Sequence, residues 1–79
     1  DLLAYPSPAS GLLQIHLNGT DIMQSISLFD ALGRVVWQCN APQPEHHVVD
    51  VSNLPSGMYV LEVRTGTGLV AKKIVIADR

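Results

Sequence analysis

The stretch Val51-Ser52-Asn53-Leu54-Pro55-Ser56-Gly57-Met58-Tyr59-Val60-Leu61-Glu62-Val63-Arg64 decides the fold class. In its second half, large apolar side chains recur at every second residue, which is the repeat of a β-strand with one buried face. One face carries Tyr59, Leu61 and Val63, and the other carries Val60, Glu62 and Arg64. This alternation is typical of antiparallel sheets, so we expect a central strand with one solvated face.

The turn before this strand has the pattern of a tyrosine corner. Gly57 stands two residues before Tyr59, and Leu54 and Pro55 precede it. In immunoglobulin-like sandwiches, a tyrosine at the start of a late strand sends its hydroxyl to a backbone group a few residues upstream. We therefore expect Tyr59 to pin the crossing between two sheets with one hydrogen bond.

In the rest of the chain, stretches with the same alternation are separated by turn-forming residues. Strands are predicted over 12–17, 24–30, 34–39, 46–51 and 69–76, and residues 2–5 can add a short first strand. Asp30 and Gly33 stand at the two ends of a turn, with Gly33 left-handed, which lets 24–30 pair with 34–39. The prediction is an all-β, immunoglobulin-like antiparallel sandwich of six or seven strands.

One face of each strand supplies the predicted core. The residues expected to be buried are Leu13, Ile15, Ile26, Leu28, Val35, Trp37, Val51, Leu54, Tyr59, Leu61 and Val63. Cys39, the only cysteine, shares a face with Val35 and Trp37, and we interpret it as a buried thiol. Trp37 has a second interpretation, stacking against a sugar, but its apolar neighbours favour the core.

Length and composition limit the classes of function. A chain of 79 residues makes one domain, residues 1–79, with residues 1–11 leading into the sandwich. Lys and Arg number 5 against 7 Asp and Glu, so the basic surplus that nucleic acid requires is missing. The apolar runs are far shorter than the roughly 20 residues that span a bilayer. Because the sequence opens without Met or an export signal, we expect a piece of a longer protein.

Candidate reactive residues do not combine into a site. His46 and His47 point to opposite faces of a strand, and His16 stands alone, so we expect no metal site. No Gly-x-Ser-x-Gly elbow surrounds a serine, so we expect neither catalysis nor a cofactor. Asn18-Gly19-Thr20 fits a glycosylation sequon, but Asn-Gly is also a strong turn signal, and we interpret it as a turn.

Four short motifs occur in order along residues 5–76. They are Tyr5-Pro6-Ser7-Pro8, Leu28-Phe29-Asp30-Ala31-Leu32-Gly33-Arg34-Val35-Val36, Val51-Ser52-Asn53-Leu54-Pro55-Ser56-Gly57-Met58-Tyr59 and Lys72-Lys73-Ile74-Val75-Ile76. Together they resemble the C-terminal sorting domain of proteins exported by the bacterial type IX secretion system. Ser7 stands where that family commonly has Asn, and both residues make local side-chain turns.

The resemblance implies a secretion signal of Gram-negative bacteria of the Bacteroidetes group. Such a domain directs its parent protein through the periplasm and across the outer membrane, to the cell surface or the extracellular space. The implied partners are the outer-membrane translocon, its receptor proteins and a sortase-like cysteine peptidase, which usually removes the domain and anchors the cargo. Nucleic acid is not an expected partner, the domain is not expected to span a membrane, and a homodimer is left open.

The alternative is an immunoglobulin-like or fibronectin-like accessory module that binds polysaccharide or spaces domains in a secreted protein. The place of the domain in its parent gene distinguishes the two hypotheses, because a sorting signal has no further domain after it.

Two sets of residues follow from these motifs. Partner recognition is assigned as a hypothesis to Lys72, Lys73, Ile74, Val75, Ile76, Ala77, Asp78 and Arg79, because a terminal strand offers an edge and carries both lysines of the chain. The structural motif residues are Tyr5, Pro6, Pro8, Asp30, Gly33, Leu54, Gly57 and Tyr59. The two prolines of the first motif are interpreted as stiffening the segment that leads into the fold.

Overall fold

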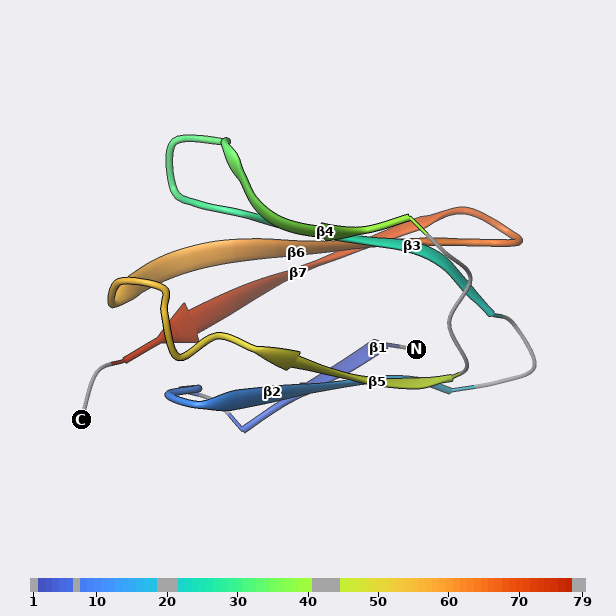
Figure 1. The fold of residues 1–79 in the computed structure, drawn as a ribbon. Coiled ribbons are helices and arrows are strands. Elements are labelled where there is room, and N and C mark those ends of the chain that lie inside the picture. The colour runs from blue at the N-terminus through green and yellow to red at the C-terminus, as the bar shows by residue number, and fades with distance from the viewer. Residues whose placement is uncertain (1, 7, 19–21, 41–44, 78–79) are drawn as a thin grey trace.

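The computed structural model describes residues 2–6, 8–18, 22–40 and 45–77, and in these residues the chain forms seven strands and no helix (Figure 1). The strands are β1 (Leu2–Tyr5), β2 (Leu12–Leu17), β3 (Met23–Phe29), β4 (Val35–Cys39), β5 (His46–Asp50), β6 (Gly57–Thr65) and β7 (Leu69–Ile76). Each predicted strand is present with small differences at its ends, and the optional first strand is β1.

Two antiparallel sheets face each other as two layers (Figure 1). The three-stranded sheet has the order β1-β2-β5, and the four-stranded sheet has the order β4-β3-β6-β7. β6 lies between β3 and β7, which confirms the prediction of a central strand, and β7 is an edge strand. The chain changes layer between β2 and β3, between β4 and β5, and between β5 and β6, as in immunoglobulin-like sandwiches.

The core lies between the layers and comes from alternate strand residues. The buried apolar residues are Leu2, Ala9, Leu13, Ile15, Leu17, Met23, Ile26, Leu28, Val49, Val51, Tyr59, Leu61, Val63, Ile74 and Ile76. Among the predicted core residues, Trp37 and Leu54 are half-buried and pack against this cluster. Val35 is the exception, because half of its surface is exposed to solvent.

The prediction for Val35 is wrong because β4 contains a bulge. Leu28 on β3 pairs with Trp37, but the next residue, Phe29, pairs with Val35, so Val36 is an additional residue on β4. The bulge turns Val35 to the outer face, where it is 50% exposed, while Val36 packs against the core. The alternation of Val35 with Trp37 therefore does not continue through the bulge.

The two open sides of the sandwich are closed by different contacts. On one side, Trp37 of β4 stacks near His47 of β5 with 5.8 Å between ring centroids. Cys39 on the same edge strand is only half-buried, which corrects the prediction of a buried thiol.

On the other side, the N–H of Ala9 donates to the carbonyl of Val75 (3.0 Å) and the N–H of Ala77 donates to the carbonyl of Ala9 (2.9 Å). These bonds form a parallel bridge onto β7.

The bulge leads to a test by paired substitutions. Leu28→Ala removes a buried side chain, so we expect the free energy of unfolding to fall by about 2–5 kcal/mol. Val35→Ala should change it by no more than about 0.5 kcal/mol, because this side chain faces solvent. Urea denaturation followed by circular dichroism measures both values. An equally large loss for Val35→Ala would contradict the outward position of this residue.

Candidate functional site

The sequence motifs gather at one end of the sandwich, although they are far apart in the chain. Gly57 at the start of β6 pairs with Ile76 at the end of β7, and Ile76 is bridged to Ala9. The N–H of Val51 donates to the carbonyl of Gly11 at 2.8 Å, which adds the start of β2 to the same end. We call this region, formed by residues 8–11, 30–34, 51–59 and 76–77, the motif end; it lies at the left of Figure 1.

The turn between β3 and β4 is organised by the carboxylate of Asp30. Its Oδ1 accepts hydrogen bonds from the N–H groups of Leu32 (2.9 Å) and Arg34 (3.0 Å), and its Oδ2 accepts one from Nε of Arg34 (2.8 Å). The N–H of Gly33 donates to the carbonyl of Asp30 at 3.0 Å. Gly33 has a φ of 85°, a left-handed conformation that glycine adopts without steric cost, as predicted. The turn 30–34 is therefore fixed by several short bonds.

The charges of this turn are presented unequally to solvent. The side chain of Asp30 is 14% exposed, whereas that of Arg34 is 74% exposed. The N–H of Arg34 is the main cause that holds the pKa of Asp30 below its usual value of 3.8, while partial desolvation opposes this shift. The Arg34 guanidinium and the N–H of Leu32 lower that pKa further. The carboxylate is thus ionised and turned inward, and the exposed charge of the turn is positive.

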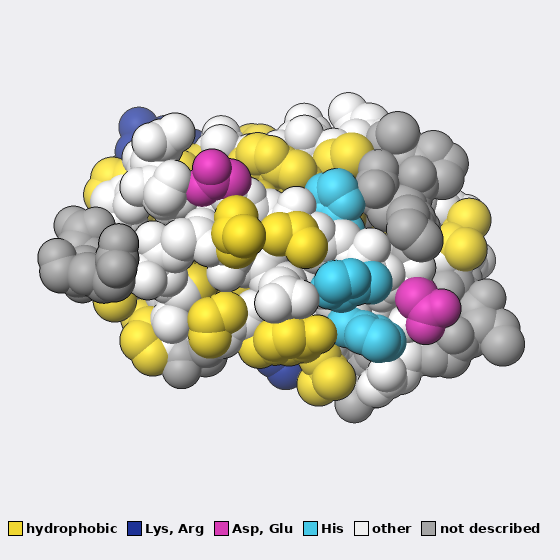
Figure 2. Space-filling model, turned by 60° about the horizontal axis from the view of Figure 1, so that its bottom comes forward, with side chains coloured by type: hydrophobic (Ala, Val, Ile, Leu, Met, Phe, Trp, Pro, Cys, Tyr) yellow, Lys and Arg dark blue, Asp and Glu magenta, His cyan; other side chains and the backbone are white. Residues whose placement is uncertain are grey.

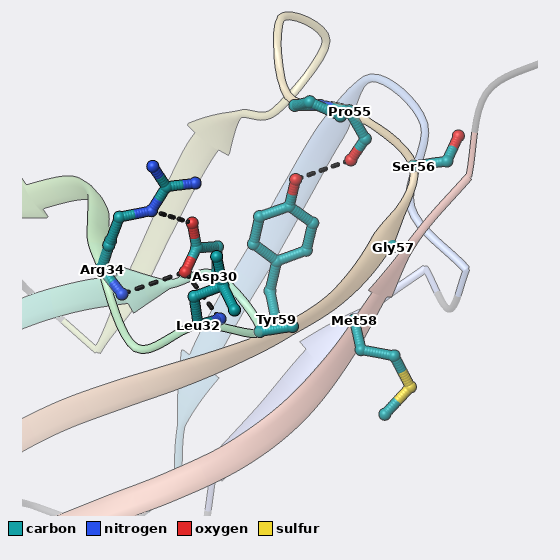
Figure 3. Close-up of a pocket in the computed structure, with 9 residues that line it drawn as sticks. Asp30, Leu32, Arg34, Pro55, Ser56, Gly57, Met58 and Tyr59 are labelled. Carbon is teal, nitrogen blue, oxygen red and sulfur yellow. Dashed lines mark hydrogen bonds and ion pairs between the residues drawn. The ribbon is translucent and has the colours of Figure 1, made fainter.

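The crossing from β5 to β6 contains the predicted tyrosine corner. The hydroxyl of Tyr59 donates to the carbonyl oxygen of Pro55 at 2.6 Å (Figure 3). Gly57, between them, has a φ of 156°, which other residues rarely adopt. The N–H of Leu54 donates to the carbonyl of Val51 at 3.1 Å, and the half-buried Leu54 side chain packs on the core. The crossing is held by backbone, hydroxyl and apolar contacts together.

A second carboxylate stabilises the beginning of this crossing. Oδ1 of Asp50 accepts hydrogen bonds from the hydroxyl of Ser52 at 2.6 Å and from its N–H at 2.9 Å. The Ser52 hydroxyl is the larger of the two causes that lower the pKa of Asp50 below 3.8. Each end of the β5–β6 crossing is therefore tied by a side-chain hydrogen bond to the backbone.

A depression of about 240 Å³ lies between the turn 30–34 and the corner (Figure 3). The turn contributes Asp30, Ala31, Leu32 and Arg34, and the corner contributes Pro55, Ser56, Gly57, Met58 and Tyr59. The lining has no nucleophile paired with a base and no cluster of carboxylates. Its chemistry is that of a contact surface, with one exposed guanidinium beside apolar and backbone groups.

The predicted recognition residues of the last strand are divided between the core and the surface. Ile74 and Ile76 are buried, whereas Lys73 and Val75 are exposed. Lys72 reaches across the open side of the sandwich, where its Nζ donates to the carbonyl of Leu2 at 3.4 Å. Ala77 is half-buried, and Asp78 and Arg79 lie outside the described residues.

The first motif lies beside the motif end rather than in the depression. Tyr5 is 40% exposed, and the peptide bond between Tyr5 and Pro6 is cis. Pro8 is exposed, and Ser7 lies outside the described residues. Of the structural motif residues, the depression is lined by Asp30, Gly57 and Tyr59.

A histidine pair that sequence reasoning treated as separate lies on the outer face of the three-stranded sheet. His16 pairs with His46 across β2 and β5, with 6.0 Å between ring centroids, so the expectation that His16 stands alone is wrong. Nε2 of His46 lies 3.1 Å from Oε1 of Gln14, and Nε2 of His16 lies 3.7 Å from Oε2 of Glu45. Figure 2 shows histidines gathered toward one end of this face with an acidic side chain beside them. Only the strand register reveals this pairing.

Two further features concern function. Within residues 2–6, 8–18, 22–40 and 45–77, no three or more His, Cys, Asp or Glu side chains are grouped so that they hold a metal ion. In the same ranges, no helix is long and apolar enough to cross a membrane. Gly19 and Thr20 of the sequon Asn18-Gly19-Thr20 lie outside the described residues, so the predicted turn stays a prediction.

Comparison with known proteins identifies a family. A family model for the secretion system C-terminal sorting domain matches residues 3–77 of the chain. The match includes β2 to β7 in full and covers all four motifs. A search of curated proteins finds no match.

The tyrosine corner can be tested with the two tyrosines of the chain. Tyr59→Phe keeps the buried ring but removes the hydroxyl, so we expect the free energy of unfolding to fall by roughly 0.5–1.5 kcal/mol. Tyr5→Phe is the matched control, because this side chain lies on the outer face. Chemical denaturation gives both values, and equal stability of the two variants would mean that the corner hydrogen bond does not contribute.

The turn carboxylate predicts a dependence of stability on pH. Because the pKa of Asp30 is lower in the folded state, its contribution is complete above the unfolded value near 3.8 and is lost as the pH falls through the folded pKa. We expect Asp30→Asn to lower stability at neutral pH and to reduce the loss of stability on acidification. Asp50 retains a similar dependence, so Asp30→Asn/Asp50→Asn should be flatter still. Urea unfolding at neutral and acidic pH measures the change, and an unaltered pH profile in Asp30→Asn would contradict it.

Proposed function

Because the chain belongs to the secretion system C-terminal sorting domain family, it is a sorting signal for type IX secretion, and we propose that it is read as a folded surface rather than as a linear peptide. The observation that carries this conclusion is the match over residues 3–77, which extends through both sheets. Such a signal implies interaction with the type IX secretion system and export to the outer membrane or cell surface. An accessory module that binds polysaccharide or spaces domains is not favoured.

In this proposal the domain acts as a sorting signal and takes no part in catalysis. The sorting-domain family is not an enzyme family, and the depression at the motif end has the lining of a contact surface. Residues 1–79 act as one unit, and support for this comes from the common core, to which both layers contribute.

The order in which the partners act is taken from the family resemblance. The outer-membrane translocon and its receptor proteins bind the domain first, and a sortase-like cysteine peptidase then removes it and anchors the cargo at the cell surface. A cut upstream of β1 leaves the pairing of β1 with β2 intact, so the released domain keeps both sheets. A cut between Tyr5 and β2 instead separates β1 from the rest of its sheet.

The exposed side of β7 is proposed as one recognition surface. The backbone groups of Val75 and Ala77 that face the edge of the sheet bond to Ala9. By the alternation of an antiparallel strand, Ala71 and Lys73 direct backbone groups to the same edge, upstream of the part that Ala9 occupies. A free strand edge is a template for a strand of a partner, and Lys73 adds a positive charge there. Because an antiparallel pairing centred on Lys73 would oppose two lysines, the edge favours a partner protein over a second copy of the chain.

The buried residues of β7 determine how this proposal is tested. Deletion of residues 72–79 would remove Ile74 and Ile76 from the core, so a loss of export would not separate recognition from unfolding. A charge reversal at the exposed Lys73 changes the edge without removing a core side chain.

We expect Lys73→Glu to reduce export of a reporter fused to the chain in a bacterium with a type IX secretion system. Arg64→Glu is the matched control, because it reverses an exposed charge on β6 while leaving the edge of β7 unchanged. Protease accessibility of the reporter on intact cells measures export, and thermal unfolding of the purified fusions checks the fold. Equal export of the two folded variants would place recognition away from Lys73.

A further inference from the structure

We propose that the turn 30–34 and the depression beside Tyr59 form a second recognition surface, which binds a segment of a protein partner that carries a carboxylate next to an apolar side chain. We call it the turn surface. The inference rests on the proposed function, since the partner belongs to the secretion machinery, but it involves different residues from the edge of β7.

Leu32 is the first feature that points to a protein partner. It is 81% exposed, the largest exposed fraction among the large apolar side chains that are described as exposed. Its N–H is held by Oδ1 of Asp30, so its backbone position at the tip of the turn is fixed. Because the backbone is already ordered, binding costs only the freedom of the Leu32 side chain, which gains from burial in an apolar pocket. A sugar or a phosphate offers no such pocket, so this residue favours a protein surface.

Arg34 supplies the charge complementarity that selects an acidic group. Asp30 accepts a hydrogen bond from Nε of Arg34, and Figure 3 draws no interaction at the two terminal nitrogens of the guanidinium. The Arg34 side chain is 74% exposed while the Asp30 side chain is 14% exposed, so a partner meets the positive charge first. Two free nitrogens in a planar group match the two oxygens of a carboxylate.

The depression gives the turn surface its shape. The rigid turn forms one wall, the segment Pro55–Tyr59 forms the other, and the corner hydrogen bond holds Tyr59 and Pro55 in place. Both walls are fixed before binding, which lowers the entropic cost of association. An apolar side chain of the partner fits between these walls, while Leu32 and Arg34 contact the residues beside it.

The turn residues Leu32 and Arg34 are separate from the β7 edge, although the other wall of the depression pairs with the inner side of β7. The turn joins β3 to β4, and β4 and β7 are the opposite outer strands of the four-stranded sheet. A substitution in the turn therefore leaves the free edge of β7 unchanged, and the two surfaces can be tested independently.

Export of the reporter fusion tests the turn surface with matched variants. Leu32→Ser and Arg34→Glu change this surface, while Leu69→Ser and Arg64→Glu make the same changes at the other end of the sheet, where Arg64 pairs with Leu69, which is 54% exposed. We expect each turn variant to slow the appearance of the reporter at the cell surface by about tenfold, the factor of one charge-assisted or well-packed contact. The two control variants should be exported at the unaltered rate.

Three checks keep the result interpretable. Thermal unfolding shows whether the turn variants stay folded, and Arg34→Lys, which keeps the charge but loses the planar pair of donors, should be impaired if the partner group is a carboxylate. If the unaltered fusion is not exported, the proposed function fails and this inference falls with it. If the unaltered fusion is exported and the folded Leu32→Ser and Arg34→Glu variants match it, the inference alone is overturned.

Crosslinking identifies the partner directly. A photoreactive amino acid at position 32, in secreting cells, should crosslink to a protein of the secretion machinery, and the same group at position 69 should not. Arg34→Glu, introduced into the protein that carries the photoreactive residue at position 32, should abolish that crosslink. A crosslink from position 32 to a second copy of the chain, or to a glycan, would overturn the proposal.

Discussion

The hydrogen bond from Tyr59 to Pro55 is the constraint on which the arrangement of the two sheets depends. Residues 51–56 carry the chain from β5 in one layer to β6 in the other, and the bond fixes the point at which β6 begins. β6 then pairs with both β3 and β7, so the point at which it begins affects two of the three strand pairs of the four-stranded sheet. Together with the backbone bond of Leu54 and its packing on the core, the hydroxyl at the corner thus fixes where that sheet begins relative to the other layer.

The same local bonds that determine the fold also give the motif end a constant shape. The carboxylate of Asp30 satisfies the backbone of its turn and leaves Leu32 and Arg34 facing outward. Residues whose first role is structural therefore define a surface that a partner can read. This explains why motifs without catalytic chemistry suit a sorting signal, for which a fixed shape and charge are sufficient.

Sequence reasoning predicted the features that depend on neighbouring residues. Alternation along β6 and the spacing of Gly57 and Tyr59 are local patterns, so the strands and the corner were predictable. The outward turn of Val35 and the pairing of His16 with His46 depend on how two strands align, and a one-residue shift in register reverses every face. For the same reason, the convergence of the turn and the corner around one depression was not visible in the sequence, although its lining residues all lie within two of the four motifs.

The bridge between Ala9 and β7 has a mechanical consequence. Because the two segments run parallel, tension applied upstream of β1 and downstream of β7 pulls them along their length in opposite directions. The two hydrogen bonds of Ala9 then bear the load together in shear instead of opening one after the other. A motor or pore that pulls on the C-terminal end of the chain meets these two bonds before the rest of β7, whereas a pull on the N-terminal end first loads the pairing of β1 with β2.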